Sequence, residues 1–205
     1  AGRFGKKSGQ GVYNWRSDKP TVGWYEAVSD GDSAGYSEKR SDGVTKIDDL
    51  LLIETQGETA QALAARYACP VVVIDRLEGD VAVIASAASN PDSATRKAVH
   101  YLQQRGKRVL QVADYPGLII WRTLAMIINE ALDALQKGVA REEDIDTAMR
   151  LGVNYPRGPL AWGEQLGWQR VLILLENLQR HYGEERYRPS SLLRQRALLE
   201  SSYES

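Results

Sequence analysis

The sequence predicts an α/β segment with a degenerate Rossmann-like, parallel sheet, followed by an all-α helical bundle. Short runs rich in Val, Ile and Leu alternate with longer amphipathic runs between residues 47 and 113. Strands that alternate with helices in this way are typical of a parallel sheet. From residue 114 onward the apolar residues recur at helical spacing only.

The composition excludes several classes of function. The 205 residues are 43% hydrophobic and 26% charged, with a formal net charge of -1. A nucleic-acid or membrane-surface partner would demand a basic excess, so neither is expected. The longest apolar run, 117–128, contains Arg122 and is followed by Asn129 and Glu130, so it is too short and too polar to span a bilayer. Small molecules and proteins remain as partners.

Cysteine usage indicates a reducing compartment. Cys69 is the only cysteine, so it cannot form an internal disulfide, and the cytoplasm is the predicted location. Cys69 precedes Pro70 at the start of an apolar run, where a buried structural thiol is more typical than a nucleophile.

Residues 1–15 combine glycines with lysines and an arginine and end in Tyr13 and Trp15. Two interpretations stay open. The glycine N–H groups could cradle a phosphate or CoA, or the segment could pack on a neighbouring domain with its aromatic residues as anchors. Residues 16–46, rich in Ser, Asp and Gly, predict a linker. Because the chain lacks a starting Met and opens within a glycine-rich motif, we expect a piece of a longer protein.

The α/β segment contains four short β-branched runs and two amphipathic ones. Asn90 is predicted as the N-cap of the second helix and Gly106 as its C-cap. The predicted strands are 50–55, 70–75, 80–86 and 107–114, and the predicted helices are 57–68 and 90–106.

The unit that ends in Asp75 has the outline of a dinucleotide-binding βαβ motif, in which an acidic residue about 20 positions after a glycine turn binds the ribose. Only Gly57 stands where three glycines are needed, and Glu58 would face the pyrophosphate at the helix N-terminus. We therefore interpret Asp75 as a solvated carboxylate at a strand end, with nucleotide binding as the alternative.

Local signals mark the helices of the bundle. Gly138 is a natural C′ residue for the first helix, and the acidic residues 142–144 favour a helix start through the helix dipole. The predicted helices are 114–137 with its opening Pro-Gly turn, one that starts at 142, one from Pro159 at N1 to about Gly183, and one that starts at Pro189.

The first of these helices is apolar almost all round, so it must be buried on most sides. It nevertheless carries Arg122, Asn129, Glu130 and Asp133, and buried charges need partners. Arg122, Asn129 and Asp133 lie on nearly the same face, which favours a polar network within or between helices over a ligand contact. Glu130 is expected to satisfy the end of a neighbouring helix.

The chain shows no complete active site. His100 lies on an amphipathic helix and His181 near a helix end, and both are interpreted as structural or solvated. The sequence contains no Gly-x-Ser-x-Gly motif, no phosphate-binding loop and no cluster of residues at metal-ligand spacing.

The stretch 114–168 resembles the C-terminal helical domain of the 3-hydroxyacyl-CoA dehydrogenase family. The family pattern has a Pro-Gly-Phe-x-x-Asn-Arg opening, then Asn-Glu-Ala, then Gly-Val-Ala-x-x-x-Asp-Ile-Asp, and a Gly-Pro start to the next helix. The matching residues are Pro116, Gly117, Arg122, Asn129, Glu130, Ala131, Gly138, Val139, Ala140, Asp144, Ile145, Asp146, Gly158, Pro159 and Gly167.

The resemblance implies a division of the chain into four parts. Residues 1–15 would be the tail of a first copy of the C-terminal domain, and residues 16–46 a linker. Residues 47–113 would be a degenerate Rossmann-like α/β domain, and residues 114–205 a second copy of the helical domain.

The resemblance also implies NAD-dependent oxidation of a 3-hydroxyacyl-CoA to a 3-oxoacyl-CoA. The family's catalytic His within His-Phe-Phe-Asn-Pro, its partner Glu and the Gly-rich NAD loop have no counterpart here, so no catalytic or cofactor-binding residue is assigned. Trp121 replaces the Asn that precedes Arg, which the family implies to meet the substrate. The four candidates for substrate or interface contact are Arg122, Asn129, Glu130 and Trp121.

The expected role is therefore that of a scaffold and dimerisation portion. Its partners would be the acyl-CoA substrate of the parent enzyme, the parent's N-terminal domains, which would hold NAD, and a second copy in a homodimer or pseudo-dimer. The apolar faces of the later helices, with Trp162 and Trp168, favour such an interface. The alternative is a non-catalytic helical module that binds acyl-CoA or a partner protein.

Overall fold

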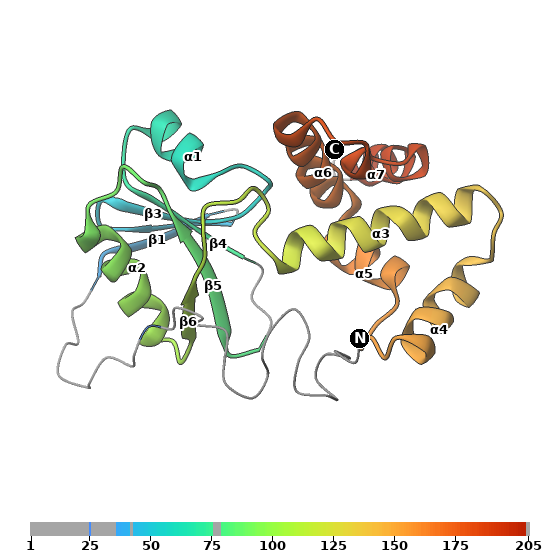
Figure 1. The fold of residues 1–205 in the computed structure, drawn as a ribbon, viewed down its shortest axis with the longest axis horizontal. Helices are drawn as coiled ribbons and strands as arrows, with labels where there is room; N and C mark the ends of the chain where they lie inside the picture. The colour runs from blue at the N-terminus through green and yellow to red at the C-terminus, as the bar shows by residue number, and fades with distance from the viewer. Residues whose placement is uncertain (1–24, 26–35, 42, 76–78, 204–205) are drawn as a thin grey trace, which may run out of the picture.

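The computed structural model describes residues 25, 36–41, 43–75 and 79–203. Figure 1 shows two domains side by side, an α/β domain (residues 36–113) and a helical domain (residues 114–203). This is the order of domains that the sequence predicts, so the fold class is confirmed. The tail predicted over 1–15 and most of the linker predicted over 16–46 lie outside the described residues.

A six-stranded sheet forms the centre of the α/β domain, with the strands in the order β1-β2-β3-β4-β5-β6. The pairs β3–β4 and β5–β6 are parallel, and the other three neighbouring pairs are antiparallel. The strands are β1 Glu38–Ser41, β2 Val44–Ile47, β3 Leu50–Glu54, β4 Val71–Ile74, β5 Val81–Ser86 and β6 Arg108–Gln111.

The sheet is mixed. Among the four predicted strands, the prediction of a parallel sheet is correct for β3–β4 and β5–β6 and wrong for β4–β5. A helix joins β3 to β4 and another joins β5 to β6, and a helical crossover lets the next strand run in the same direction. Residues 75–80, between β4 and β5, are too few for a crossover, so the chain turns back and the two strands pair antiparallel.

The predicted linker ends earlier than residue 46, because residues 38–41 and 44–47 form β1 and β2. In β2, Thr45 and Ile47 are buried and Lys46 is exposed, which is the alternation of a strand with one face on a core. Four residues carry too short an alternation to stand out from their Ser-, Asp- and Gly-rich surroundings.

One helix covers each face of the sheet (Figure 1): α1 (Ala60–Tyr67) and α2 (Asp92–Gln103). Along β4, the side chains point alternately into the two cores. Val71 and Val73 pack beneath α1, and Val72 and Ile74 pack beneath α2. All four residues of β4 are buried, which explains why this strand is a continuous apolar run.

The helical domain packs around a single large core. The aromatic and aliphatic residues of this core come from all of its long helices except α4, which has no buried residue. Within the described part of the chain, no helix is long and apolar enough to cross a membrane. The helices are α3 Ile120–Gln136, α4 Glu142–Gly152, α5 Pro159–Leu166, α6 Trp168–Tyr182 and α7 Ser191–Tyr203, with a short 3-10 helix, η2, at Glu185–Tyr187.

The local end signals are confirmed at three places. Gly138 follows α3 with φ 68° and Gly183 follows α6 with φ 66°, the left-handed conformation that glycine adopts without strain. The first turn of α4 contains Glu142, Glu143 and Asp144, as the dipole argument predicts.

The predicted third helix of the bundle is wrong as a single element, because Gly167 divides it into α5 and α6. Gly167 has φ 91° and ψ 124°, far from helical values. The break folds the indole of Trp168 onto Gly163, where an added Cβ would lie 2.0 Å from ring atom Cζ3. Glu200 of α7 accepts the N–H of Gln169 at 2.7 Å and so caps the second piece.

Asn90 is not the N-cap of α2, contrary to the prediction. Pro91 holds that position, and no side chain caps it. Asn90 instead donates from Nδ2 to the carbonyl oxygen of Val71 at 2.7 Å, and its Oδ1 accepts the N–H of Val71 at 3.1 Å. The amide therefore satisfies the backbone at the start of β4.

Candidate functional site at the domain boundary

The glycine turn of the dinucleotide-like motif lies against α6 of the helical domain. Gly57 has φ 89°, and an added Cβ would lie 2.7 Å from the carbonyl oxygen of Leu174 and 2.9 Å from Cβ of Asn177. Asn177 also donates from Nδ2 to the carbonyl oxygen of Gln56 at 2.8 Å. Glycine is needed here because a helix packs directly on the backbone of the turn.

The N-terminus of α1 is occupied by Asp114, a residue that follows β6. One carboxylate oxygen accepts the N–H of Ala60 at 2.7 Å and the other accepts the N–H of Gln61 at 2.9 Å. The hydroxyl of Thr59 accepts the N–H of Ala62 at 3.1 Å. The carboxylate suits the positive end of the helix dipole and takes the N–H groups that a phosphate would use in a nucleotide site.

Asp75 is buried, so its interpretation as a solvated carboxylate is wrong. The residue is 1% exposed. Its Oδ2 accepts the N–H groups of Ile119 and Ile120 at 2.8 and 2.7 Å, and its Oδ1 accepts that of Trp121 at 2.9 Å. The first N–H groups of α3 have no partner within the helix, and a buried start needs an acceptor from elsewhere in the fold.

All three parts of the dinucleotide-binding outline thus have internal roles. The turn at Gly57 packs on α6, the N-terminus of α1 binds Asp114, and Asp75 binds the start of α3. Glu58, which the sequence places near the expected pyrophosphate, forms an ion pair with Arg66. This geometry disfavours the nucleotide-binding alternative.

Trp121 belongs to the core of the helical domain. It is 1% exposed and packs in the same cluster as Leu124, Leu160 and Leu175. A side chain buried to this degree is not available to a substrate or to another chain in this structure. Of the four candidates for substrate or interface contact, Trp121 does not fit that role.

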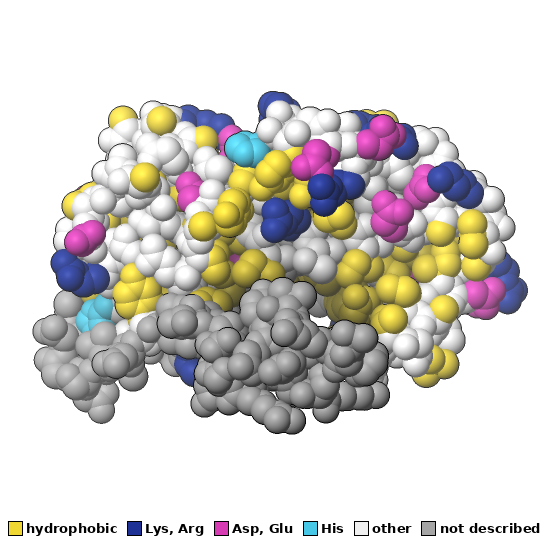
Figure 2. All heavy atoms as spheres, in the orientation of Figure 1, with side chains coloured by type: hydrophobic (Ala, Val, Ile, Leu, Met, Phe, Trp, Pro, Cys, Tyr) yellow, Lys and Arg dark blue, Asp and Glu magenta, His cyan; other side chains and the backbone are white. Residues whose placement is uncertain are grey.

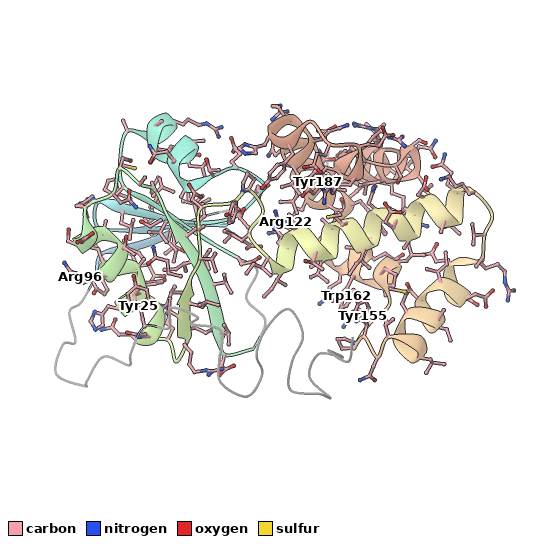
Figure 3. All side chains as sticks on the ribbon, viewed as in Figure 1. Tyr25, Arg96, Arg122, Tyr155, Trp162 and Tyr187 are labelled. Carbon is pink, nitrogen blue, oxygen red and sulfur yellow. The ribbon has the colours of Figure 1, made fainter. Side chains whose placement is uncertain are left out.

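Arg122 lies at the start of α3, where the two domains meet (Figure 3). Its Nη1 donates to the hydroxyl of Tyr182 at 3.4 Å. Burial raises the pKa of Tyr182 above its ordinary value, and the charge of Arg122 opposes part of that rise. Tyr182 in turn stacks on Tyr187, with the ring centroids 5.2 Å apart. Arg122 therefore connects the start of α3 to Tyr182 at the end of α6.

Asn129 is buried and links α3 to the turn before α7, with partners different from those predicted. Its Nδ2 donates to the carbonyl oxygen of Arg188 at 3.0 Å, and its Oδ1 accepts the N–H of Ser190 at 2.8 Å. It therefore holds the turn that leads into α7. Asp133 forms an ion pair with Lys137 on its own helix, so Arg122, Asn129 and Asp133 do not form one network.

Glu130 is exposed on α3. Its carboxylate has no hydrogen-bond or ion-pair partner among the residues that the structure describes, so the predicted contact with a neighbouring helix end is not formed within this part of the chain. The side chain faces outward because the spacing of Trp121, Leu124, Ile128 and Leu132 turns the opposite side of α3 into the core.

His100 and Cys69 lie apart from this boundary site, whereas His181 lies beside Tyr182. The Tyr36 hydroxyl lies 2.5 Å from Nδ1 of His100, and the ring of His181 meets Tyr182 edge-on at 4.8 Å. Cys69 is partly buried beside the core beneath α1. Across the described ranges, no group of three His, Cys, Asp or Glu residues could hold a metal ion.

Sequence reasoning missed three carboxylates that cap distant helices. Besides Asp114, Asp146 accepts the N–H groups of Leu160 and Ala161 at 2.8 and 3.0 Å, and Glu200 caps α6. Asp146 belongs to the Asp-Ile-Asp motif of the family pattern, so this motif could have indicated that Asp146 caps α5. Asp114 and Glu200 carry no comparable local signal.

The chain thus combines a Rossmann-like α/β domain with an all-helical domain. Residues 52–116 match the family model "3-hydroxybutyryl-CoA dehydrogenase reduced Rossmann-fold domain", and residues 117–202 match "3-hydroxyacyl-CoA dehydrogenase, C-terminal domain". The chain belongs to the 3-hydroxyacyl-CoA dehydrogenase family, and the resemblance found in the sequence is confirmed.

The chain is similar to three characterised or solved proteins. It is 76% identical over 204 residues to the 3-hydroxyadipyl-CoA dehydrogenase of Escherichia coli K12, covering 100% of this chain and 43% of the relative. A solved 3-hydroxybutyryl-CoA dehydrogenase from Escherichia coli K12 has 76% identity and a TM-score of 0.91 over 98% of this chain and 43% of that one. The solved (S)-3-hydroxybutyryl-CoA dehydrogenase of Ralstonia eutropha has 26% identity and a TM-score of 0.62. This match covers 74% of this chain and 55% of that chain. The chain thus spans less than half of the Escherichia coli relatives.

Proposed function

We propose that the chain acts as the C-terminal part of an NAD-dependent 3-hydroxyacyl-CoA dehydrogenase, with the role of scaffold and dimerisation surface. In the reaction, the 3-hydroxyl group gives its proton to a base and C3 gives a hydride to NAD, which leaves a 3-oxoacyl-CoA. The base, the NAD loop and the acyl-CoA contacts would belong to the part of the relatives that this chain does not cover. The single cysteine fits a cytoplasmic enzyme.

The observation that carries this proposal is the internal use of the nucleotide motif. Gly57, Asp75 and the N-terminus of α1 all bind other parts of the chain. A Rossmann-like domain with these contacts serves packing, and it leaves cofactor binding to another domain. The burial of Trp121 at the family's substrate-facing position supports the same division of labour.

The interface part of the proposal rests on apolar side chains left exposed by the helical domain. Figure 2 shows hydrophobic side chains gathered over this domain on the face toward the viewer. Five large apolar residues on or beside α4 and α7 are each more than half exposed: Val139, Leu151, Val153, Leu198 and Leu199. Apolar surface of this kind is typical of an interface, here with a second copy in a homodimer or with the parent's N-terminal domains in a pseudo-dimer. Glu130, exposed on α3, remains a candidate for the same interface.

An assay of NADH production tests the proposal. The chain is incubated with NAD and with either 3-hydroxyadipyl-CoA or 3-hydroxybutyryl-CoA, the two acyl groups in the names of the Escherichia coli relatives. We expect activity from the full-length Escherichia coli relative and none from this chain. NADH production by the chain alone would overturn the scaffold role.

Titration calorimetry with NAD and with the same CoA esters separates the scaffold role from the alternative of a module that binds acyl-CoA. The proposal predicts flat titrations for the chain alone. Tight binding of a CoA ester would favour the alternative, and tight binding of NAD would reopen the motif at Gly57 as a cofactor site.

A further inference from the structure

We propose that Asp75 and Asp114 lock the α/β domain and the helical domain into one cooperative folding unit. Asp75 lies in the α/β domain and caps α3 of the helical domain. Asp114 fixes the connection between the domains to the start of α1. The inference concerns how the two domains hold one another, and it holds whichever acyl-CoA the parent enzyme uses.

The two caps hold the start of α3 and the segment that leads to it. Asp75, at the end of β4, accepts three N–H groups from the start of α3, between 2.7 and 2.9 Å. Asp114, in the segment that leads to α3, accepts two N–H groups from the start of α1, at 2.7 and 2.9 Å. Hydrogen bonds to a carboxylate are stronger than neutral ones. Separating the domains would therefore break the three bonds of Asp75 and leave its carboxylate, which is 1% exposed, without these partners. Freeing the connection would break the two bonds of Asp114 as well.

A second set of contacts lies beside the two caps. Along α6, Arg170 pairs with Glu54 at 2.8 Å, the backbone of Leu174 covers Gly57, and Asn177 donates to the carbonyl oxygen of Gln56. Residues 170, 174 and 177 follow one another at helical spacing, so one face of α6 contacts the end of β3 and the turn after it. The helical domain is thus attached at two separate strands of the sheet.

The connection between the domains is itself held on both sides. Leu118 is 1% exposed in the core beneath α1, and it keeps a left-handed backbone at φ 48°, which is unusual for a residue with a side chain. An added Cβ at Gly117 would lie 3.2 Å from Cδ2 of Leu178 on α6. A connection packed between two cores cannot act as a hinge. Domains joined by an open linker usually move independently. The packed connection here should instead make the two domains move as one.

Scanning calorimetry of the full chain tests the lock. The wild-type chain should unfold in a single transition whose calorimetric and van't Hoff enthalpies agree. In Asp75→Asn and Asp114→Asn, an N–H₂ donor replaces one of the two accepting oxygens. Each variant should show two resolved transitions, or a calorimetric enthalpy above the van't Hoff value. Amide exchange over residues 112–119 should rise by roughly tenfold or more, the factor for loss of one charge-assisted hydrogen bond.

Asp146→Asn is the matched control, because Asp146 caps α5 with the same two-oxygen geometry inside a single domain. It should lower the melting temperature and keep one transition. The lock is wrong if the Asp75 and Asp114 variants behave like Asp146→Asn in both measurements.

A milder variant keeps the test decisive if the aspartate variants do not fold. Asn177→Ala removes the bond to Gln56 and the exposed bond from Arg180 within α6, and it should raise amide exchange both at residues 55–59 and across the connection at 112–119. A rise confined to 55–59 would show that the two regions open independently and would overturn the lock.

Discussion

Asp75 and Trp121 meet across the domain boundary: Oδ1 of Asp75 accepts the backbone N–H of Trp121 at 2.9 Å, and both residues are 1% exposed. This hydrogen bond fixes the backbone at Trp121, and the indole extends from there into the core of the helical domain. The first turn of α3 is therefore positioned by the α/β domain, at the place where the family pattern implies a substrate contact.

Replacing Trp121 with Asn, the residue of the family pattern, should damage the fold without creating a substrate contact. The change removes a buried indole and buries an amide, so we expect the free energy of unfolding to fall by at least about 3 kcal/mol. Urea denaturation measures the loss, and Trp121→Phe should lose clearly less. Equal stability of the Asn variant and the wild type, or a new affinity for CoA esters, would contradict the core role.

Gly57→Ala should destabilise the chain more than Gly106→Ala. Both glycines have positive φ, 89° and 73°, so both substitutions strain the backbone by about 1 kcal/mol. Only at Gly57 would the new Cβ meet α6, at 2.7 Å from a carbonyl oxygen, whereas Gly106 has no atom within 4 Å. Overpacking should add about 1–3 kcal/mol in urea denaturation. Equal losses for the two variants would argue against the contact between the turn and α6.

Gly163→Ala should disturb the junction of α5 and α6. A Cβ at this position overlaps the ring of Trp168, which is itself packed under the guanidinium of Arg196 at 4.8 Å from the ring centroid. We expect a loss of about 1–3 kcal/mol and a changed near-ultraviolet circular dichroism signal. Gly152→Ala, in α4 with open space around it, serves as the control and should change stability by less than about 1 kcal/mol. If Gly163→Ala changed neither the stability nor the circular dichroism signal, the packing of Trp168 on Gly163 at the break after Gly167 would be contradicted.

Tyr182 should titrate at higher pH than an exposed tyrosine, because burial raises its pKa. A raised folded-state pKa means that the related stability is present below the pKa of the unfolded chain, about 10, and is lost as pH rises through the folded-state value. The difference in phenolate absorbance between wild type and Tyr182→Phe measures this transition. Arg122→Met should raise the pKa of Tyr182 further, since it removes the opposing positive charge. A Tyr182 that ionises at the ordinary value would refute the burial argument.

The doubly substituted Leu198→Asp, Leu199→Asp chain should lose self-association and keep its fold. Both leucines are exposed, by 72% and 61%, so the charges should change the free energy of unfolding by less than about 0.5 kcal/mol each. Sedimentation velocity over a range of concentrations measures association. Tyr67→Asp, at a residue of the α/β domain that is 48% exposed, is the control. A wild-type chain that stays monomeric at high concentration, or a variant that associates as well as the wild type, would count against an interface on α7.

The features predicted correctly from the sequence have causes that lie close together along the chain. The end of α3 at Gly138 and the start of α4 at Glu142 follow from backbone preference and from the helix dipole, which act within one turn. The family pattern adds the domain type, because its motif residues are contiguous. These signals predict most of the helices, the strands β3 to β6 and the family that the chain resembles, but neither β1 and β2 nor the break between α5 and α6.

The tertiary structure alone decided how these segments use their polar groups. Asp75 and Trp121 are 46 residues apart, and Asp114 and Ala60 are 54 apart, so no local pattern could pair them. The mixed sheet is also a result of the tertiary structure, because the direction of β5 depends on where the chain turns after β4. A carboxylate becomes a buried cap only when folding brings a helix N-terminus to it and removes the water that would otherwise solvate it.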